Sequence, residues 1–191
     1  HHPDLRQYTT IWMDSLRDGT FILANTNKLI RFYDGATGLK TGSTSTAGYC
    51  VSATAERGGM ELIAVVMKGL TGEKRFADAK TLLNYGFSTY ALTQIQPGQA
   101  LRPVDVRLGA EETVQPVLEE NNCLLLEKSR LGKLEQKITL VEQVEAPVEQ
   151  GQRLGELTVS EGDEVLAVLP ILASASVAKL SWGQVMAELL R

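Results

Sequence analysis

The sequence is poor in the residues from which metal sites and catalytic dyads are usually built. It has two histidines, both at the very N-terminus, and two cysteines, Cys50 and Cys123, far apart in the chain. Because zinc sites and nucleophile-base pairs draw on histidine and cysteine, the two N-terminal histidines cannot supply a catalytic dyad for the body of the chain. Both cysteines lie in apolar runs, which predicts buried thiols rather than a disulfide or a metal site.

Neither sign of charge dominates the sequence, and long apolar runs are missing. Nineteen basic and twenty-three acidic residues give a net charge of −4, with no basic block. A nucleic-acid partner is therefore excluded, since its phosphates need a concentrated positive surface. No apolar run has the length of a membrane span, and no stretch resembles a signal peptide. With 43% hydrophobic and 22% charged residues, the composition is that of an ordinary globular protein.

The hydrophobic pattern changes near residue 93, where we predict a domain boundary. Before it, apolar residues at helical spacing predict a helix from Leu5 to Leu16 that ends at Asp18-Gly19. Strand-like runs follow in "TFILANT", around "LKTGSTS" and in "YCVSATAE", and a glycine turn joins the last of these to "MELIAVVMKG" as a β-hairpin. A second helix is predicted from Gly72 to Tyr90, with one apolar face made of Phe76, Ala79, Leu83, Phe87 and Tyr90.

Beyond the boundary the pattern is that of a β domain. Short alternating runs such as "PVDVRLG", "QKITLVEQV" and "DEVLAVLPIL" are separated by Gly, Pro, Asn and acidic residues. This spacing predicts a small sandwich or barrel over residues 93–175. The last stretch, "SVAKLSWGQVMAELLR", returns to a helical period and predicts an amphipathic tail helix over residues 176–191.

One stretch, "GATGLKTGSTSTAGYC" at residues 35–50, combines a lysine, a run of hydroxyls and four glycines immediately before a strand. Small residues let another backbone come close, and Lys-Thr-Gly offers a fixed charge, a hydroxyl and an open strand edge. This combination suits recognition of a peptide-like anion. The tripeptide alone is a weak signal, because three residues recur by chance, so its context must decide.

That context resembles a known family. From "NTNKLIRFYDG" to "EKRFADAKTLLNYGF" the sequence is similar to the C-terminal half of the penicillin-binding transpeptidase domain of the low-molecular-mass D-alanyl-D-alanine carboxypeptidases. The β-rich region and the tail resemble that family's C-terminal domain and membrane-associating end. The resemblance implies an α+β fold: an incomplete penicillin-binding/β-lactamase-like transpeptidase domain (antiparallel sheet plus helices) over residues 1–92, a small all-β, sandwich-like domain over 93–175, and the tail helix over 176–191.

The resemblance also implies an activity and a location. The parent protein would be a serine-type enzyme of the bacterial cell envelope, on the outer face of the cytoplasmic membrane. It would remove the terminal D-alanine from peptidoglycan stem pentapeptides through an acyl-enzyme, without a metal or organic cofactor, and β-lactams would bind it.

In that family three motifs build the site in a fixed order: Ser-x-x-Lys with the acylating serine and its lysine base, Ser-x-Asn, and Lys-Thr-Gly. A serine hydroxyl needs a neighbouring base to become a nucleophile. This chain has only the third motif in its expected place. Ser176-Val-Ala-Lys179 matches the first in letters but follows Lys-Thr-Gly and lies in the tail, and no Ser-x-Asn occurs. We therefore expect a C-terminal portion that is inactive alone.

The resemblance assigns a role to each remaining site residue. Lys40 would place a positive charge beside the serine-lysine pair. Thr41 would hydrogen-bond the substrate carboxylate, Gly42 would let the substrate lie along the strand edge, and the backbone N–H of Ser43 would help form the oxyanion hole. Arg75 would pair with the D-alanine carboxylate through its planar fork. The alternatives are a solvated strand-end lysine at position 40 and an exposed helix arginine at position 75.

Two other interpretations of the chain stay open. It can be a non-catalytic pedestal or interaction module whose β domain positions a partner near the membrane. A β-lactamase relative would share the Lys-Thr-Gly strand but would not account for the β domain. An incomplete first domain would expose apolar surface, which predicts self-association through residues 1–92. The amphipathic tail predicts contact with a membrane surface through residues 177–191.

Overall fold

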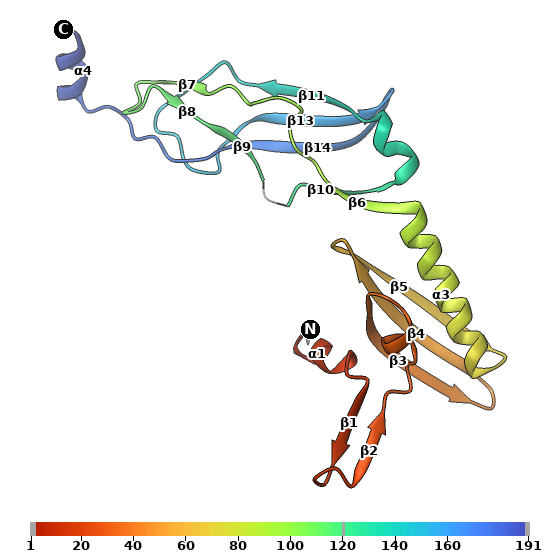
Figure 1. Cartoon of the computed structure of the whole chain (residues 1–191). Helices are drawn as coiled ribbons and strands as arrows, with labels where there is room; N and C mark the ends of the chain where they lie inside the picture. Colours follow the sequence, from red (N-terminus) through yellow and green to blue (C-terminus); the bar gives the residue numbers. More distant parts are fainter. Residues whose placement is uncertain (1–2, 120, 190–191) are drawn as a thin grey trace. The chain divides into compact units, whose positions relative to one another are not determined.

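The computed structural model describes residues 3–119 and 121–189. Contacts along the chain fall into two compact units that meet between Leu92 and Thr93 (Figure 1). The first unit is α+β and the second is built mainly of strands, as the hydrophobic patterns of the two regions predict.

The first unit is a three-stranded antiparallel sheet with a long helix on one face. The sheet order is β3-β4-β5, and both pairings are antiparallel. The strands predicted around Lys-Thr-Gly, the following hairpin and the helix predicted from residue 72 are confirmed. The elements are η1 (Pro3–Leu5), α1 (Arg6–Thr9), β1 (Met13–Leu16), β2 (Phe21–Ala24), α2 (Leu29–Phe32), β3 (Ala36–Thr44), β4 (Gly48–Arg57), β5 (Met60–Gly69) and α3 (Gly72–Thr89).

Helix α3 packs on the sheet because its apolar residues recur every three or four positions. The buried residues of this core come from α2 and its C-cap residue Tyr33, from the sheet and from α3. Several of those on the sheet are alanines, which leave room for the larger side chains of the helix. Thr71 caps the helix: its hydroxyl accepts a hydrogen bond from the Lys74 N–H at 3.1 Å. At the far end of β4, the Arg57 guanidinium carbon lies 4.7 Å from the ring centroids of both Tyr33 and Phe87. Burial raises the pKa of the Tyr33 hydroxyl.

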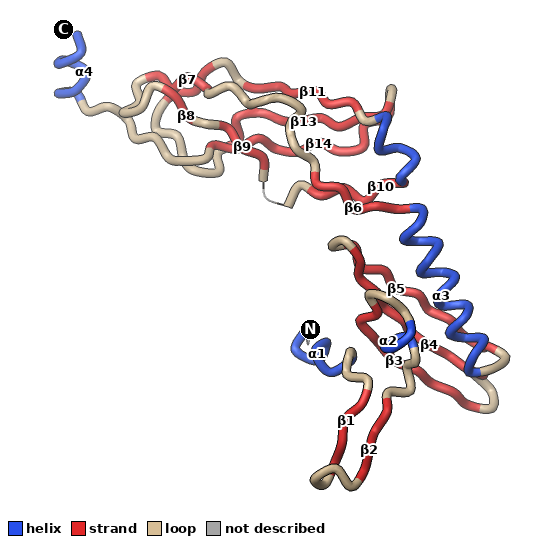
Figure 2. The backbone as a smooth tube through the Cα atoms, in the orientation of Figure 1, coloured by secondary structure: helices blue, strands red, loops and turns tan. Residues whose placement is uncertain are grey.

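The predicted helix from Leu5 to Leu16 is wrong beyond its first turns. The chain forms η1 and α1 and then turns into a β-hairpin of β1 and β2, which projects from the rest of the unit as an isolated pair (Figure 2). Arg17, Asp18 and Gly19 at its turn all have positive φ angles, of 53°, 53° and 88°. Asp-Gly is a strong hairpin signal, and here it outweighs the helical spacing of the apolar residues.

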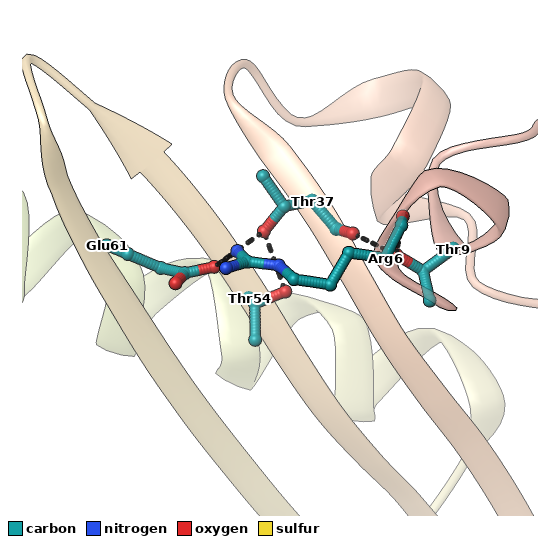
Figure 3. A network of polar contacts seen from close by, with 5 residues as sticks. All are labelled: Arg6, Thr9, Thr37, Thr54 and Glu61. Carbon is teal, nitrogen blue, oxygen red and sulfur yellow. Dashed lines mark hydrogen bonds and ion pairs between the residues drawn. The ribbon is translucent and has the colours of Figure 1, made fainter. Parts of the chain in front are cut away.

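A polar network attaches α1 to the sheet (Figure 3). The Arg6 guanidinium pairs with the carboxylate of Glu61 on β5. The Thr37 hydroxyl on β3 lies 2.8 Å from that of Thr54 on β4 and 3.3 Å from the same carboxylate. The Thr9 hydroxyl bonds to the Thr37 carbonyl. The network therefore crosses all three strands at one end of the sheet.

The second unit is all-β apart from one 3-10 helix and the tail helix. Its strands form a four-stranded sheet in the order β11-β13-β14-β9, a three-stranded sheet in the order β12-β7-β8, and the pair β10-β6. The elements are β6 (Tyr90–Gln94), β7 (Val104–Arg107), β8 (Thr113–Val114), β9 (Pro116–Leu118), β10 (Cys123–Glu127), η2 (Lys128–Lys133), β11 (Glu135–Leu140), β12 (Gln143–Glu145), β13 (Arg153–Glu161), β14 (Glu164–Ala173) and α4 (Trp182–Leu189).

Two apolar clusters form the core of the second unit. One gathers around Leu154 and Val148, and the other around Leu157 and Ile171. On the surface, Arg130 of η2 pairs with Glu161 and Glu164 at the turn between β13 and β14. The hydrogen bond from Arg130 lowers the pKa of Glu161.

The tail helix is shorter than predicted. Val177 exchanges backbone hydrogen bonds with Val148, at 2.9 Å in each direction, and its side chain is buried in the core of the second unit. Residues 177–181 are therefore extended, and the helix begins at Trp182. The side chains of Leu189 and Leu190, which belong to the predicted amphipathic tail helix, lie outside what the structure describes.

The two cysteines are free thiols, but neither is fully buried: Cys50 is half-buried and Cys123 is exposed. The prediction of buried thiols is therefore wrong for Cys123, because it lies on a short strand whose burial alternates. In the described part of the chain, every helix falls short of the length and apolarity that crossing a membrane requires.

Candidate functional site

Lys-Thr-Gly lies on the edge of the sheet. Strand β3 is the outer strand, and Lys40, Thr41 and Gly42 pair with Ser52, Val51 and Cys50 on β4. Lys40 is exposed, and its Nζ donates to the Thr41 carbonyl. A Cβ added at Gly42 would meet no atom of the described chain within 4 Å. The space that this glycine leaves open therefore faces away from the protein.

Hydrogen bonds from the "NTNKL" loop hold the strand that carries Lys-Thr-Gly. Thr41 is buried, and its hydroxyl lies 2.7 Å from the hydroxyl of Thr26. The Asn27 side chain donates to the Gly38 carbonyl at 3.0 Å, and its carbonyl oxygen accepts from the Leu29 N–H at 3.2 Å. Since a hydroxyl has one donor and two acceptor positions, the pair of threonines retains capacity for a further partner.

Arg75 comes from the first turns of α3 and reaches the same strands. Its Nη1 donates to the carbonyls of Gly42 and Cys50, each at 3.3 Å, and these two residues face each other across β3 and β4. Its guanidinium carbon lies 4.6 Å from the ring centroid of Phe76 and 5.6 Å from that of Tyr49. The residue is only 8% exposed. The alternative of an exposed helix arginine is therefore wrong.

The Arg75 guanidinium has no acidic partner among the described residues. Its contacts are two neutral carbonyls and two aromatic rings, and its Nε is buried without a hydrogen-bond partner. A buried charge without a counter-charge is costly. The arrangement thus has the chemistry of an anion site, beside the open edge at Gly42.

Ser43 is exposed on β3 opposite Tyr49. Lys40, Thr41, Gly42 and Ser43 thus lie between the middle and the end of β3, and Arg75 reaches this part of the β3–β4 pair. Two residues that support them, Thr26 and Tyr49, were not predicted as site residues from the sequence. Both lie in the stretch whose resemblance we noted, but no residue pattern marks a hydroxyl pair or a ring beside a cation.

Ser176 and Lys179 are engaged in the structure of the second unit. The Ser176 Oγ accepts a hydrogen bond from the Gln150 N–H at 2.9 Å, and the Lys179 Nζ lies 3.4 Å from Glu145 Oε1. Their segment is extended rather than helical. A residue and its third successor share a face on a helix, so the extended backbone does not present them as a nucleophile and base.

Metal chemistry has no candidate site in the described residues: no three of their His, Cys, Asp and Glu side chains gather closely enough to hold an ion.

Two family models match the chain in succession. The model for D-alanyl-D-alanine carboxypeptidase matches residues 1–71, and the model for the C-terminal domain of penicillin-binding protein 5 matches residues 89–179. The two matches fall one in each unit, and almost all of α3, with Arg75, lies between them.

Curated relatives carry the same names. The D-alanyl-D-alanine carboxypeptidase DacF of Bacillus subtilis is 33% identical over 93% of this chain, and DacD of Escherichia coli is 32% identical over 73%. The chain covers 47% and 37% of those two proteins. It therefore spans half or less of the length of the relatives it matches.

Solved structures share the fold of both units. Penicillin-binding protein 3 of Streptococcus pneumoniae aligns with a TM-score of 0.62 and 26% identity over 92% of this chain and 53% of that one. Penicillin-binding protein 5 of Haemophilus influenzae aligns with a TM-score of 0.70 over 93% of this chain and 52% of that one, and at 23% identity it supports the fold alone. The first unit is accordingly part of a transpeptidase-like domain, and the second is the β domain that follows it in these proteins.

Proposed function

Because the chain belongs to the low-molecular-mass penicillin-binding proteins of the D-alanyl-D-alanine carboxypeptidase family, we propose that it is the C-terminal portion of a serine-type enzyme. That enzyme trims the terminal D-alanine from peptidoglycan stem peptides outside the cytoplasm. The observation that carries the proposal is the buried Arg75 cation, which lies beside Lys-Thr-Gly and has no acidic partner in the part of the chain that the structure describes.

In this proposal the strand edge and Arg75 recognise the end of the peptide. The substrate lies along β3 as an added strand, in the space that Gly42 leaves open. Its terminal carboxylate binds near the Thr41 hydroxyl and the Arg75 guanidinium, which lies close to the rings of Tyr49 and Phe76. This supplies binding and orientation for the scissile bond.

Lys40 and Ser43 stabilise the negative charge that develops during acylation. Lys40 is the exposed cation on the motif strand, where it stabilises negative charge that develops in acylation. The Ser43 N–H contributes to the oxyanion hole together with the N–H of the acylating serine. That serine, its lysine base and the Ser-x-Asn motif belong to the part of the parent protein that precedes this chain.

Penicillin labelling of the intact gene product separates an enzyme from an interaction module. We expect a covalent adduct that survives denaturing gel electrophoresis, because the acyl-enzyme is an ester of the active-site serine. An intact product that never labels would support the module, and one that labels but releases the ligand within seconds would indicate a β-lactamase relative.

We also propose that the tail binds a membrane surface. Trp182 is 83% exposed and Met186 is half exposed on α4, which is too short to span a bilayer. A deletion that starts at Ser181 spares Val177 and Lys179, which belong to the second unit. In liposome flotation the whole chain should rise with anionic vesicles, and the deletion variant should not. Equal behaviour of both would instead assign the tail to packing on the protein.

A further inference from the structure

Two asparagine side chains hold the loop that carries Thr26. The Asn25 amide donates to the Ile11 carbonyl at 3.0 Å, and its oxygen accepts a hydrogen bond from the Asn27 N–H at 2.9 Å. The Asn27 amide in turn donates to the Gly38 carbonyl on β3 at 3.0 Å, and Asn27 is only 1% exposed. The backbone on both sides of Thr26 is therefore fixed, and the Thr26 side chain takes no part in these bonds.

The Thr26 hydroxyl bonds instead to the motif itself. It lies 2.7 Å from the hydroxyl of Thr41, and either oxygen can be the donor. Thr41 is buried on β3, whereas Thr26 is exposed on its loop. Because a hydroxyl has one proton, the direction of this bond decides whether Thr41 has a proton to give to another group.

A bound carboxylate would fix that direction. An ionised carboxylate only accepts hydrogen bonds, so the Thr41 hydroxyl must donate its proton to it. Thr41 can then only accept from Thr26, and the two bonds run in one direction from Thr26 through Thr41 to the anion. Successive hydrogen bonds of this kind polarise and strengthen each other. The threonine pair is therefore suited to an anion in a way that Thr41 alone is not.

We propose that Thr26 is a positioning residue for the carboxypeptidase reaction. It donates to the Thr41 hydroxyl and so turns the Thr41 proton toward the terminal carboxylate of the substrate. This role rests on the proposed function, in which that carboxylate binds near Thr41 and Arg75. Thr26 acts through Thr41 and does not touch the substrate, so its effect on the reaction must disappear when the Thr41 hydroxyl is removed.

A double-mutant cycle in the intact parent enzyme tests this role, with kcat/KM measured on a peptide that ends in D-Ala-D-Ala. Thr26→Val removes the hydroxyl and should lower kcat/KM about three- to tenfold. Thr41→Val should lower it at least about tenfold, because it removes a hydrogen bond to a charged group. In the Thr41→Val background, Thr26→Val should cause no further loss, since the bond that orients Thr41 is already absent.

Thr54→Val is the matched control. The Thr54 hydroxyl lies 2.8 Å from that of Thr37, so the same two strands hold a second threonine pair, near the start of β3 and away from Lys-Thr-Gly. This variant should keep the wild-type kcat/KM when compared at equal folded fraction. Thr26→Ser retains the hydroxyl and should also stay close to the wild type.

The possible outcomes separate this role from the proposed function. Equal losses from Thr26→Val with and without the Thr41 hydroxyl, or a loss of the same size in Thr54→Val, would overturn the positioning role. Full turnover in Thr26→Val beside a clear loss in Thr41→Val would overturn it as well, and would leave the proposed function in place. A parent enzyme without turnover, or Thr41→Val with full turnover, would overturn the proposed function and the role of Thr26 with it.

Discussion

The 191-residue chain will form no covalent adduct with a fluorescent penicillin and will not hydrolyse peptides that end in D-Ala-D-Ala. In the proposed function a serine and its lysine base form the acyl-enzyme, and this chain holds the Lys-Thr-Gly strand without a Ser-x-x-Lys before it. Loss of such a unit costs on the order of a millionfold in turnover. The one Ser-x-x-Lys sequence, Ser176 to Lys179, is extended, and both side chains already have partners in the second unit.

The measurement is in-gel fluorescence after denaturation, with the intact gene product as the positive control. A labelled band from the 191-residue chain would contradict the prediction. The variant Ser176→Ala then identifies the source: loss of the band would make Ser176 a nucleophile, and a retained band would place the nucleophile elsewhere in the chain.

The strand that carries Lys40 and the helix that carries Arg75 could be predicted from the sequence, because their patterns are local. Glycines separate the apolar runs of the hairpin, and Thr71 and the buried face of α3 specify the helix. What could not be predicted is the burial of Arg75. It depends on the rings of Phe76 and Tyr49 and on two carbonyls of different strands, which only the folded sheet brings together.

The errors have physical reasons of the same kind. The segment that ends at Leu16 has apolar residues at helical spacing. All residues of β1 and β2 are exposed, however, so packing against a core does not stabilise a helix there. The Asp18-Gly19 turn decides the outcome locally. Val177 begins a stretch with helical periodicity, yet its backbone is satisfied by Val148 in the neighbouring segment. Tertiary hydrogen bonds override the pattern there.

In the intact parent enzyme, Lys40→Ala and Arg75→Ala should each cripple carboxypeptidase turnover. Removal of preorganised charge from an acylation site costs on the order of a hundredfold or more in rate. In the proposed complex Arg75 and the substrate carboxylate form a buried, hydrogen-bonded charge pair. Loss of one partner of such a pair costs about 2–5 kcal/mol, which lowers kcat/KM at least tenfold. Unchanged kcat/KM in both variants would contradict the assignment of Lys40 and Arg75 to the active site.

Arg57→Ala is the matched control for Arg75→Ala. Arg57 also lies over two aromatic rings and donates to a backbone carbonyl, that of Asp34, but it is at the far end of β4 from Lys-Thr-Gly. We expect this control to lower the thermal stability of the enzyme without a selective loss of turnover. A comparable loss of turnover at equal folded fraction would show that Arg75 acts through packing alone.

The central claim is that Arg75 and the Lys-Thr-Gly edge recognise the substrate's terminal carboxylate. The most direct measurement is kcat/KM of wild-type and Arg75→Ala parent enzyme on a peptide ending in D-Ala-D-Ala and on the same peptide as its C-terminal amide. The account predicts that Arg75→Ala loses about a hundredfold on the free acid and little on the amide, which has no carboxylate to bind. Equal losses on the acid and the amide would contradict it.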